Sequence, residues 1–416
     1  MKKILSLILA MMMLFTVAVC AEEVDAILLE EATTEIMVER NVTVTVDGIL
    51  LAFEDQKPMI DNDRTLIPLR AIFEALNATV GWDGDTYTVT ATKGETTMAL
   101  TIGETAYTVN GESKEMDVPA KIENDRTLVP LRVVSETLGC EVEWDAAEYQ
   151  VIVSTPEYLA AVAEADRVRA IEPTLDGAYK TVDGVRLPIK MYIPAESETK
   201  NIAVLTIHGG SWYAITADSD NWDGSWMNYQ AQYYFDKFGY TTAAISYRGI
   251  NFNGETTVFD IVEDCKDAVA YMREQADFDK LIIMGDSSGG HLAVELGLDD
   301  EVGADIIVAA NPVLDLTVSY WGYAVKTEED RAVASPSHNT KKTDTKFLVM
   351  HGNKDAVVDF NISKKFCEDM TALGTKADLI ELDGKDHAFI LSRYQSTDVQ
   401  INEYMAMIDA YLADNL

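Results

Sequence analysis

Short apolar segments alternate with helical patterns from Pro173 to the C-terminus, and this alternation constrains the fold more than any other feature. One of the helical patterns is VFDIVEDCKDAVAYMREQ. A hairpin pattern, YKTVDGVRLPIKMYIP, precedes the first of the apolar segments. The apolar segments are NIAVLTIH, TTAAISY, LIIMG, DIIVAAN, KFLVMHG and ADLIEL. Strands that are apolar throughout are buried on both faces, as in a parallel sheet covered by helices. The pattern predicts a doubly wound α/β sheet over 173–416, with its chemistry beyond the carboxyl ends of the strands.

An internal repeat occupies the preceding part of the chain. NDRTLIPLRAIFEALNATVGWDGDTYTV at 62–89 returns as NDRTLVPLRVVSETLGCEVEWDAAEYQV at 124–151, 62 residues later. Each repeat predicts alternating strands, a polar turn, a short helix after PLR and a strand past the tryptophan. We therefore expect a smaller α+β domain of two repeats over 40–154. The repeated positions are Arg64 and Arg126, Pro68 and Pro130, Trp82 and Trp144, and Tyr87 and Tyr149.

The two repeats resemble the copper amine oxidase N-terminal-like stalk domain of exported bacterial proteins. The first histidine of the chain is His208, so this region has no imidazole for copper, and its single cysteine offers one soft ligand. We interpret the recurrent Arg, Pro and Trp residues as structural. The alternative is a surface-attachment face, with the domain acting as a spacer or wall-associated arm.

The N-terminal segment predicts export. Two lysines, an apolar run and the site Val19-Cys20-Ala21 form a secretory signal peptide over 1–21. A lipoprotein signal at Cys20 and an uncleaved membrane anchor are the alternatives. No later apolar stretch is long enough to span a membrane, so we expect a secreted or surface-associated mature chain without a membrane span. A helical linker is predicted over 155–172.

The net charge limits the classes of binding partner, and the cysteine content limits the possible disulfides. The formal net charge of −37 argues against nucleic acid or another polyanion as a partner. The odd number of cysteines in the mature chain argues against a disulfide framework, although Cys265 and Cys367 could pair. The three mature-chain cysteines are Cys140, Cys265 and Cys367.

The stretch GDSSGGHLA follows the apolar strand LIIM and enters a helical pattern. Chymotrypsin-like proteases carry a similar GDSGG sequence, but they are all-β proteins with the histidine before the serine. A strand, turn and helix around G-x-S-x-G instead indicate a nucleophile elbow with Gly285, Ser287 and Gly289. Ser287 is the predicted nucleophile, and the backbone N–H of Ser288 is predicted to contribute to the oxyanion hole.

The base and its orienting acid follow in the order Ser, Asp, His that this elbow requires. Asp355 comes after the strand KFLVM, and His387 comes after the strand ADLIEL. We predict Asp355 as the acid and His387 as the base. Three further acids are weaker candidates because of their positions on the next helix or on the histidine loop: Asp359, Asp383 and Asp386.

A second motif, HGGSW at 208–212, follows the strand NIAVLTI. Glycine permits the close backbone approach that an oxyanion hole needs. We predict Gly210 and Ser211 as N–H donors and Gly209 as the turn residue, with His208 bracing the loop. Among the other histidines, His291 and His351 are interpreted as packed or hydrogen-bonded residues, and His338 as a loop residue of open role.

Together HGGSW, GDSSGGHLA, the SP at 335–336, HGNKDAVV and DHAF resemble the α/β-hydrolase esterases of the hormone-sensitive lipase and BD-FAE type. The resemblance implies hydrolysis of carboxylic esters through an acyl-serine, with no cofactor and no metal. Ser211 stands where this family often has a third glycine, which leaves the oxyanion donors open.

The substrate is less constrained. The segment 314–345 is too short for a large cap, which favours an open site and short acyl groups. The segment 211–230 carries Trp212, Tyr213, Trp222, Trp226 and Tyr229, either as a lid or sugar platform or as packing residues. An ester of a small molecule or a carbohydrate is the expected substrate. The alternatives are a peptidase or amidase on the same triad, and a wall-binding protein with an inert hydrolase domain.

Overall fold

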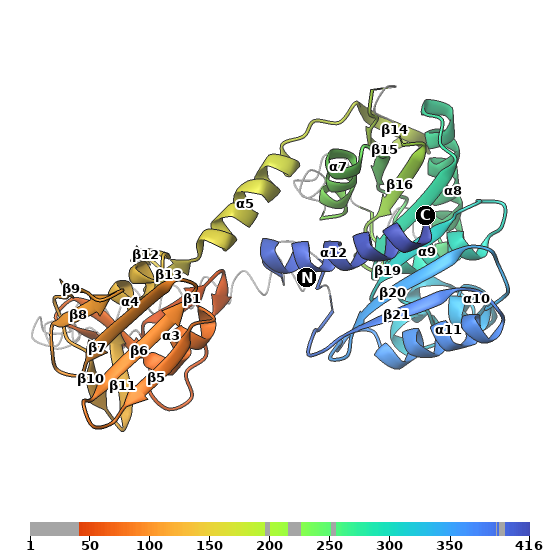
Figure 1. The fold of residues 1–416 in the computed structure, drawn as a ribbon. Coiled ribbons are helices and arrows are strands. Elements are labelled where there is room, and N and C mark those ends of the chain that lie inside the picture. Colours follow the sequence, from red (N-terminus) through yellow and green to blue (C-terminus); the bar gives the residue numbers. More distant parts are fainter. Residues whose placement is uncertain (1–40, 196–199, 215–225, 251–254, 388, 391–395) are drawn as a thin grey trace, which may run out of the picture. The chain divides into compact units, whose positions relative to one another are not determined.

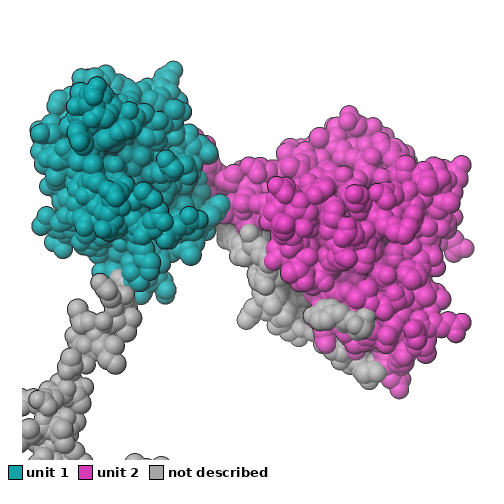
Figure 2. Space-filling model, turned by 90° about the horizontal axis from the view of Figure 1, so that it is seen from below, with its two compact units in different colours: residues 1–153 teal, residues 154–416 magenta. Residues whose placement is uncertain are grey.

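The computed structural model describes residues 41–195, 200–214, 226–250, 255–387, 389–390 and 396–416. The predicted signal peptide lies outside these residues. The chain divides into two compact units, residues 1–153 and 154–416 (Figure 2). Within the described ranges, no helix combines the length and apolarity that crossing a bilayer requires.

The described part of the first unit, residues 41–153, is rich in β-structure and contains two short helices (Figure 1). Its described strands form three sheets, ordered β12-β13-β1-β2, β10-β11-β4-β3 and β5-β6-β7-β8-β9. Its elements are β1 (Thr43–Val46), β2 (Ile49–Leu50), β3 (Met59–Asp61), β4 (Arg64–Pro68), α3 (Leu69–Ala75), β5 (Thr79–Asp83), β6 (Thr88–Lys93), β7 (Thr96–Thr101), β8 (Ala106–Val109), β9 (Glu112–Glu115), β10 (Lys121–Glu123), β11 (Arg126–Pro130), α4 (Leu131–Thr137), β12 (Glu141–Asp145) and β13 (Gln150–Ser154).

The two repeats meet at the strands that carry the LIP and LVP sequences. Strands β4 and β11 pair antiparallel with Ile67 opposite Val129, so equivalent positions of the repeats lie side by side. The repeated arginines bridge the repeats, since Arg64 pairs with Asp117 and Arg126 pairs with Asp55. The repeated arginines therefore join equivalent segments of the two repeats.

The second unit contains one sheet of eight described strands, ordered β14-β15-β17-β16-β18-β19-β20-β21. Strands β14 and β15 pair antiparallel, as the hairpin pattern predicts, and β15 pairs antiparallel with β17. Strands β16 to β21 pair in parallel with their neighbours among one another. The strands are β14 (Leu175–Val182), β15 (Val185–Tyr192), β16 (Ile202–Ile207), β17 (Thr241–Ile245), β18 (Lys280–Asp286), β19 (Ile306–Ala310), β20 (Lys346–Gly352) and β21 (Ala377–Leu382).

Helices cover both faces of this sheet (Figure 1), which confirms the doubly wound α/β prediction. Helices α8, α9 and α11 share one apolar cluster with the sheet, and α5, α7 and α12 share the other. The helical elements are α5 (Pro156–Arg169), α7 (Trp226–Phe238), α8 (Val258–Gln275), α9 (Ser288–Leu298), α10 (Glu328–Val333), α11 (Phe360–Ala372), α12 (Asp398–Asn415) and the short 3-10 helices Ser319–Ala324 and Pro336–His338.

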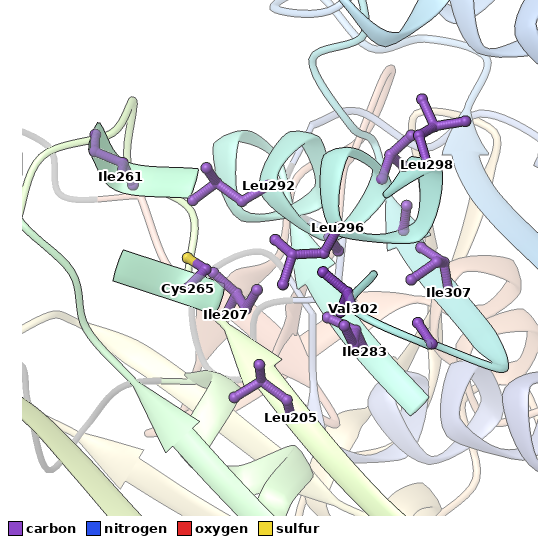
Figure 3. Close-up of a cluster of buried hydrophobic side chains, with 14 of the residues drawn as sticks. Leu205, Ile207, Ile261, Cys265, Ile283, Leu292, Leu296, Leu298, Val302 and Ile307 are labelled. Carbon is purple, nitrogen blue, oxygen red and sulfur yellow. The ribbon is translucent and has the colours of Figure 1, made fainter. Parts of the chain in front are cut away.

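The core shows why strands of this composition lie in the middle of the sheet. In β16, Leu205 and Ile207 belong to the cluster under α8 and α9, whereas Val204 belongs to the cluster under α7 and α12. Figure 3 shows Leu292 and Leu296 of α9 packed above the strands. Alternate residues of each strand thus enter opposite cores, so both must be apolar.

The segment that the sequence predicts as a linker forms α5, and this helix packs within the second unit. Its residues Ala165 and Val168 are buried in the cluster shared with α7 and α12. Arg169, at its last turn, pairs with the buried Asp398 of α12 at 2.5 Å.

The cysteines carry no disulfide among the described residues. Cys140, Cys265 and Cys367 are all buried and outside any disulfide, so Cys265 and Cys367, whose pairing the sequence left open, do not pair. Cys265 lies under α9 in one core cluster (Figure 3). Stability therefore comes from packing.

Candidate active site

The turn between β18 and α9 holds Ser287 in an unusual backbone conformation. Ser287 has a backbone φ of 53°, a left-handed value that residues other than glycine rarely adopt. The neighbouring glycines leave room for this turn. A Cβ on Gly285 would lie 2.2 Å from the carbonyl oxygen of Gly289, and a Cβ on Gly289 would lie 2.2 Å from that of Ile207.

Three loop residues predicted from the sequence meet at this turn. The Nε2 atom of His387 lies 3.0 Å from Oγ of Ser287, and its Nδ1 atom lies 2.7 Å from Oδ2 of Asp355. Asp355 follows β20 and His387 follows β21, which are neighbours in the sheet. The side chains thus form a continuous hydrogen-bonded chain from hydroxyl to imidazole to carboxylate, as nucleophile activation requires.

Asp355 accepts more hydrogen bonds than the triad alone supplies. Its Oδ2 atom also lies 3.1 Å from Nε2 of His351, and its Oδ1 atom accepts the N–H groups of Val357 and Val358 at 2.8 Å. Burial opposes the charged form, but hydrogen bonds from His351, His387 and Val358 outweigh burial and hold the pKa of Asp355 well below its usual range. The carboxylate is therefore kept ionised.

His351 is a positioning residue whose role the sequence did not reveal. Its side chain is fully buried, and its Nδ1 atom lies 2.8 Å from Oγ of Ser363 on α11. Nε2 also lies 3.3 Å from the carbonyl oxygen of Val358, which can only accept, so Nε2 carries the proton. His351 consequently donates to Asp355, as His387 does.

The weaker acid candidates have other partners. Asp386 accepts the N–H of Ala356 at 2.9 Å and that of His387 at 2.7 Å, so it joins the acid loop to the histidine loop. Asp359 caps the N-terminus of α11, and Asp383 accepts from Asn353. The one feature of the sequence that could have indicated this role of Asp386 is its position next to His387.

The HGGSW loop lies against the elbow. The N–H of Gly209 donates to Oδ1 of Asp286 at 2.9 Å, and the N–H of Trp212 donates to Oγ of Ser288 at 3.1 Å. Gly210 and Ser211, between them, both have positive φ, 102° and 58°. Within the described ranges the N–H groups of Gly210 and Ser211 make no hydrogen bond to a protein acceptor, so they are free to bind a developing oxyanion.

Asp286, which precedes the nucleophile, is a buried acid that the sequence analysis missed. Burial raises the pKa of Asp286 to about 6, although the hydrogen bond from Gly209 and the nearby His387 lower it in part. This carboxyl fixes the first turn of the HGGSW loop, so it positions the predicted oxyanion donors.

The other histidines do not reach Ser287 through any hydrogen bond of the described residues. His208 stacks on Tyr247 with ring centroids 4.5 Å apart, and its Nε2 atom lies 3.0 Å from Oγ of Ser246. Burial lowers the pKa of both His208 and His291 to about 4, so both are neutral. His338 lies 3.3 Å from the carboxylate of Asp315.

The aromatic residues of the segment 211–230 differ in burial. Trp212 is fully buried, and its indole N–H faces Nδ1 of His291 at 3.3 Å, so its interpretation as part of a sugar platform is wrong. Tyr229 is also buried, whereas Tyr213 is half exposed. The side chains of Trp222 and Trp226 lie outside the described part of the chain.

A cavity of about 340 Å³ lies beside the triad. Asp355 forms part of its wall together with the apolar side chains Val313, Leu314 and Trp321. Val313 is adjacent to the nucleophile, because its N–H donates to the carbonyl oxygen of Ser287 at 3.2 Å. Of the three triad residues, Asp355 lines this cavity, whose walls suit a small apolar group.

Metal ligands do not gather in the parts of the chain that the structure describes, where no group of three or more suitable side chains could hold an ion. The repeats at residues 40–154 contain no histidine, and their one cysteine, Cys140, is buried. Their residues therefore do not fit a copper site.

Comparisons with known proteins agree with this division. Residues 45–153 match the copper amine oxidase N-terminal domain, and residues 189–306 match BD-FAE. Esterase 2 of Thermogutta terrifontis phosphoramylated by tabun aligns with a TM-score of 0.50 and 24% identity, over 58% of this chain and 94% of that chain. The native form of the same esterase aligns with a TM-score of 0.49 and 24% identity, over 58% of this chain and 91% of that chain. A search of curated proteins found no match.

The alignment with a TM-score of 0.50 shows the α/β-hydrolase fold, and the BD-FAE match falls on the strands that carry the elbow. Residues 154–416 therefore have an α/β-hydrolase fold in which residues 189–306 match BD-FAE, and residues 45–153 of the preceding unit match the copper amine oxidase N-terminal domain.

Proposed function

We propose that this chain is a secreted serine carboxylesterase that hydrolyses short-chain acyl esters, including esters on carbohydrates, through an acyl-enzyme. The observation that carries the proposal is the pair of hydrogen bonds from Ser287 through His387 to Asp355, 3.0 and 2.7 Å long.

In the first half-reaction, Oγ of Ser287 attacks the ester carbonyl carbon while Nε2 of His387 takes the hydroxyl proton. The carbonyl oxygen becomes an oxyanion next to the N–H groups of Gly210, Ser211 and Ser288. Collapse of the tetrahedral intermediate breaks the bond to the alcohol oxygen, and His387 returns the proton to that oxygen. The alcohol leaves, and the acyl group remains on Ser287.

In the second half-reaction, water gives a proton to His387 and attacks the acyl carbon. The second tetrahedral intermediate expels Ser287, which recovers the proton from the imidazolium. Asp355, held ionised by its hydrogen bonds, stabilises the imidazolium in both halves. Atoms and charges balance without a metal or a cofactor.

The substrate class in this proposal rests on two features. The segment 314–345 is too short for a large cap over the site, which favours a short acyl group. The carbohydrate part rests on the resemblance to the BD-FAE esterases, and export rests on the predicted signal peptide.

The test compares purified chain and Ser287→Ala on p-nitrophenyl acetate and butyrate, on peptide anilides and on an acetylated polysaccharide. Ester turnover that Ser287→Ala abolishes is the expected result. A preference for anilides indicates a peptidase or amidase instead. Absence of turnover on all three substrates, with polysaccharide or cell-wall binding retained, favours a wall-binding protein with an inert hydrolase domain. N-terminal sequencing of the exported protein checks cleavage after residue 21.

A further inference from the structure

The first unit carries two aromatic pairs at equivalent positions of its repeats, and the tryptophan of each pair is exposed. We propose that this unit binds a neutral polysaccharide through these pairs, with the stronger site at Trp144. Trp82 packs edge-to-face on Tyr87 with ring centroids 5.9 Å apart, and Trp144 packs in the same way on Tyr149 at 5.0 Å. An edge-to-face partner fixes the indole and leaves one ring face available.

The same turn holds both pairs. In the first repeat, Oδ1 of Asp83 accepts the N–H groups of residues 85 and 86 at 2.9 and 3.3 Å. In the second repeat, Oδ1 of Asp145 accepts those of residues 147 and 148 at 2.9 and 3.1 Å. The residues at the tips differ, GDT in one repeat and AAE in the other, while the aspartate and the aromatic pair remain.

The tyrosines that support the tryptophans are held in an uncommon conformation. Tyr87 and Tyr149 have φ of 53° and 56°, in the left-handed region that bulky side chains avoid. Such strain persists where the surrounding structure imposes it, and it often occurs at binding sites. Here it turns each tyrosine ring towards its tryptophan.

The tryptophans do not serve the core of the unit. Trp82 and Trp144 are 51% and 40% exposed, and neither belongs to the apolar cluster that fills the unit. An indole is the side chain that gains most from burial, so its repeated exposure indicates a surface that another molecule covers. A flat, rigid ring fits the apolar C–H face of a sugar.

A groove of about 450 Å³ beside Trp144 supplies polar partners for the same ligand. Arg64 is held by Asp117 at 3.0 Å, and Arg132 is held by Glu136 at 3.2 Å, all four lining the groove. Each pair presents fixed donors and acceptors, and a sugar hydroxyl can use both kinds. The equivalent groove between Arg70 and Arg126 lacks Trp82 among its walls, which makes the Trp144 site the stronger one.

Charge selects the type of glycan. The groove beside Trp144 is lined by five acidic and two basic side chains, and the whole chain carries a formal charge of −37. Polymers with carboxylate, sulfate or phosphate groups are therefore repelled. A neutral polysaccharide is the ligand that matches both the aromatic rings and the charge.

The test measures depletion of the full chain from solution by insoluble cellulose, xylan, mannan and chitin, with a polygalacturonate gel as the anionic comparison. The chain carries Ser287→Ala in every sample, so hydrolysis does not alter the polymer. We expect Trp144→Ala to weaken binding to at least one of the neutral polymers by roughly tenfold. Trp82→Ala weakens it less, and the double variant removes binding.

Two controls separate ring stacking from damage to the fold. Leu50→Ala removes an apolar side chain that is 61% exposed and lies outside both pairs, and it should leave binding unchanged. Trp144→Phe keeps an aromatic face and should retain most of the affinity. The proposal is overturned if no neutral polymer depletes the chain, if the double variant binds like its parent, or if polygalacturonate binds more tightly than the neutral polymers. It is independent of esterase activity, because binding is measured with the nucleophile removed.

Discussion

Asp286→Asn tests whether a buried acid beside the nucleophile costs stability at neutral pH. Burial raises the pKa of Asp286 from 3.8 to about 6 in the folded chain. The folded state therefore holds the proton more tightly than the unfolded state, and stability is lost as the pH rises through about 6. A shift of about two pH units corresponds to roughly 3 kcal/mol at pH 8. Asparagine cannot ionise, and its oxygen can still accept the N–H of Gly209.

We expect Asp286→Asn to stabilise the second unit by up to about 3 kcal/mol at pH 8, and by almost nothing at pH 4. Calorimetry at both pH values measures this difference. The relevant transition is the one that coincides with the loss of esterase activity on heating, because the two units can unfold separately. Asp344→Asn, at an exposed aspartate, is the matched control and should show no such pH dependence.

The same variant should lower activity. The negative charge of Asp286 lies close enough to His387 to interact with it, so its removal disfavours the imidazolium that forms during catalysis. A fall of kcat/KM at pH 8 together with a gain in stability is the expected combination. An equal change of stability at pH 4 and pH 8, or destabilisation at pH 8, would refute the reasoning.

Three further predictions concern the second unit, and the first of them uses Gly81 of the first unit as its control. Gly289→Ala places a Cβ 2.2 Å from a carbonyl oxygen of β16 and should prevent soluble folding, whereas Gly81→Ala, whose Cβ meets nothing closer than 3.9 Å, should be tolerated; far-UV circular dichroism of both decides. Burial raises the pKa of Glu295 to about 7, so Glu295→Gln should raise Tm more at pH 8.5 than at pH 5, and equal increments would contradict this. His351→Phe removes a donor to Asp355, so kcat/KM should fall roughly tenfold to a hundredfold. The pKa of Asp355 then rises, and an unchanged kcat/KM would argue against the positioning role.

The sequence predicts the reacting side chains because each one follows an identifiable strand. Ser287, Asp355 and His387 come directly after the apolar segments that form β18, β20 and β21, and parallel strands end at the same edge of the sheet. Their order along the chain then assigns the roles. The doubly wound fold follows from the same segments, since strands that are apolar at every position need helices on both faces.

Contacts between the loops at this edge of the sheet could not be predicted from the sequence. The bond from Gly209 to Asp286 joins residues 77 positions apart, and it depends on how closely two turns approach. His351 was recognised as buried, but its donation to Asp355 depends on the path of the loop after β20. The sequence allowed Trp212 to be either part of a sugar platform or a core residue, because an aromatic residue after a glycine pair fits both patterns. The contact of its indole N–H with His291 decides for the core.

The packing of α5 sets where the hydrolase can be separated from the repeats. Thr155 caps this helix by accepting the N–H of Tyr158 at 3.1 Å, and the helix then lies against α7 and α12. An expression boundary at residue 173, where the α/β pattern begins, would strip this cover from the C-terminal helix and leave Asp398 without its arginine. A stand-alone enzyme should therefore begin at or before Thr155, and the peptide that joins the two units belongs to the catalytic half.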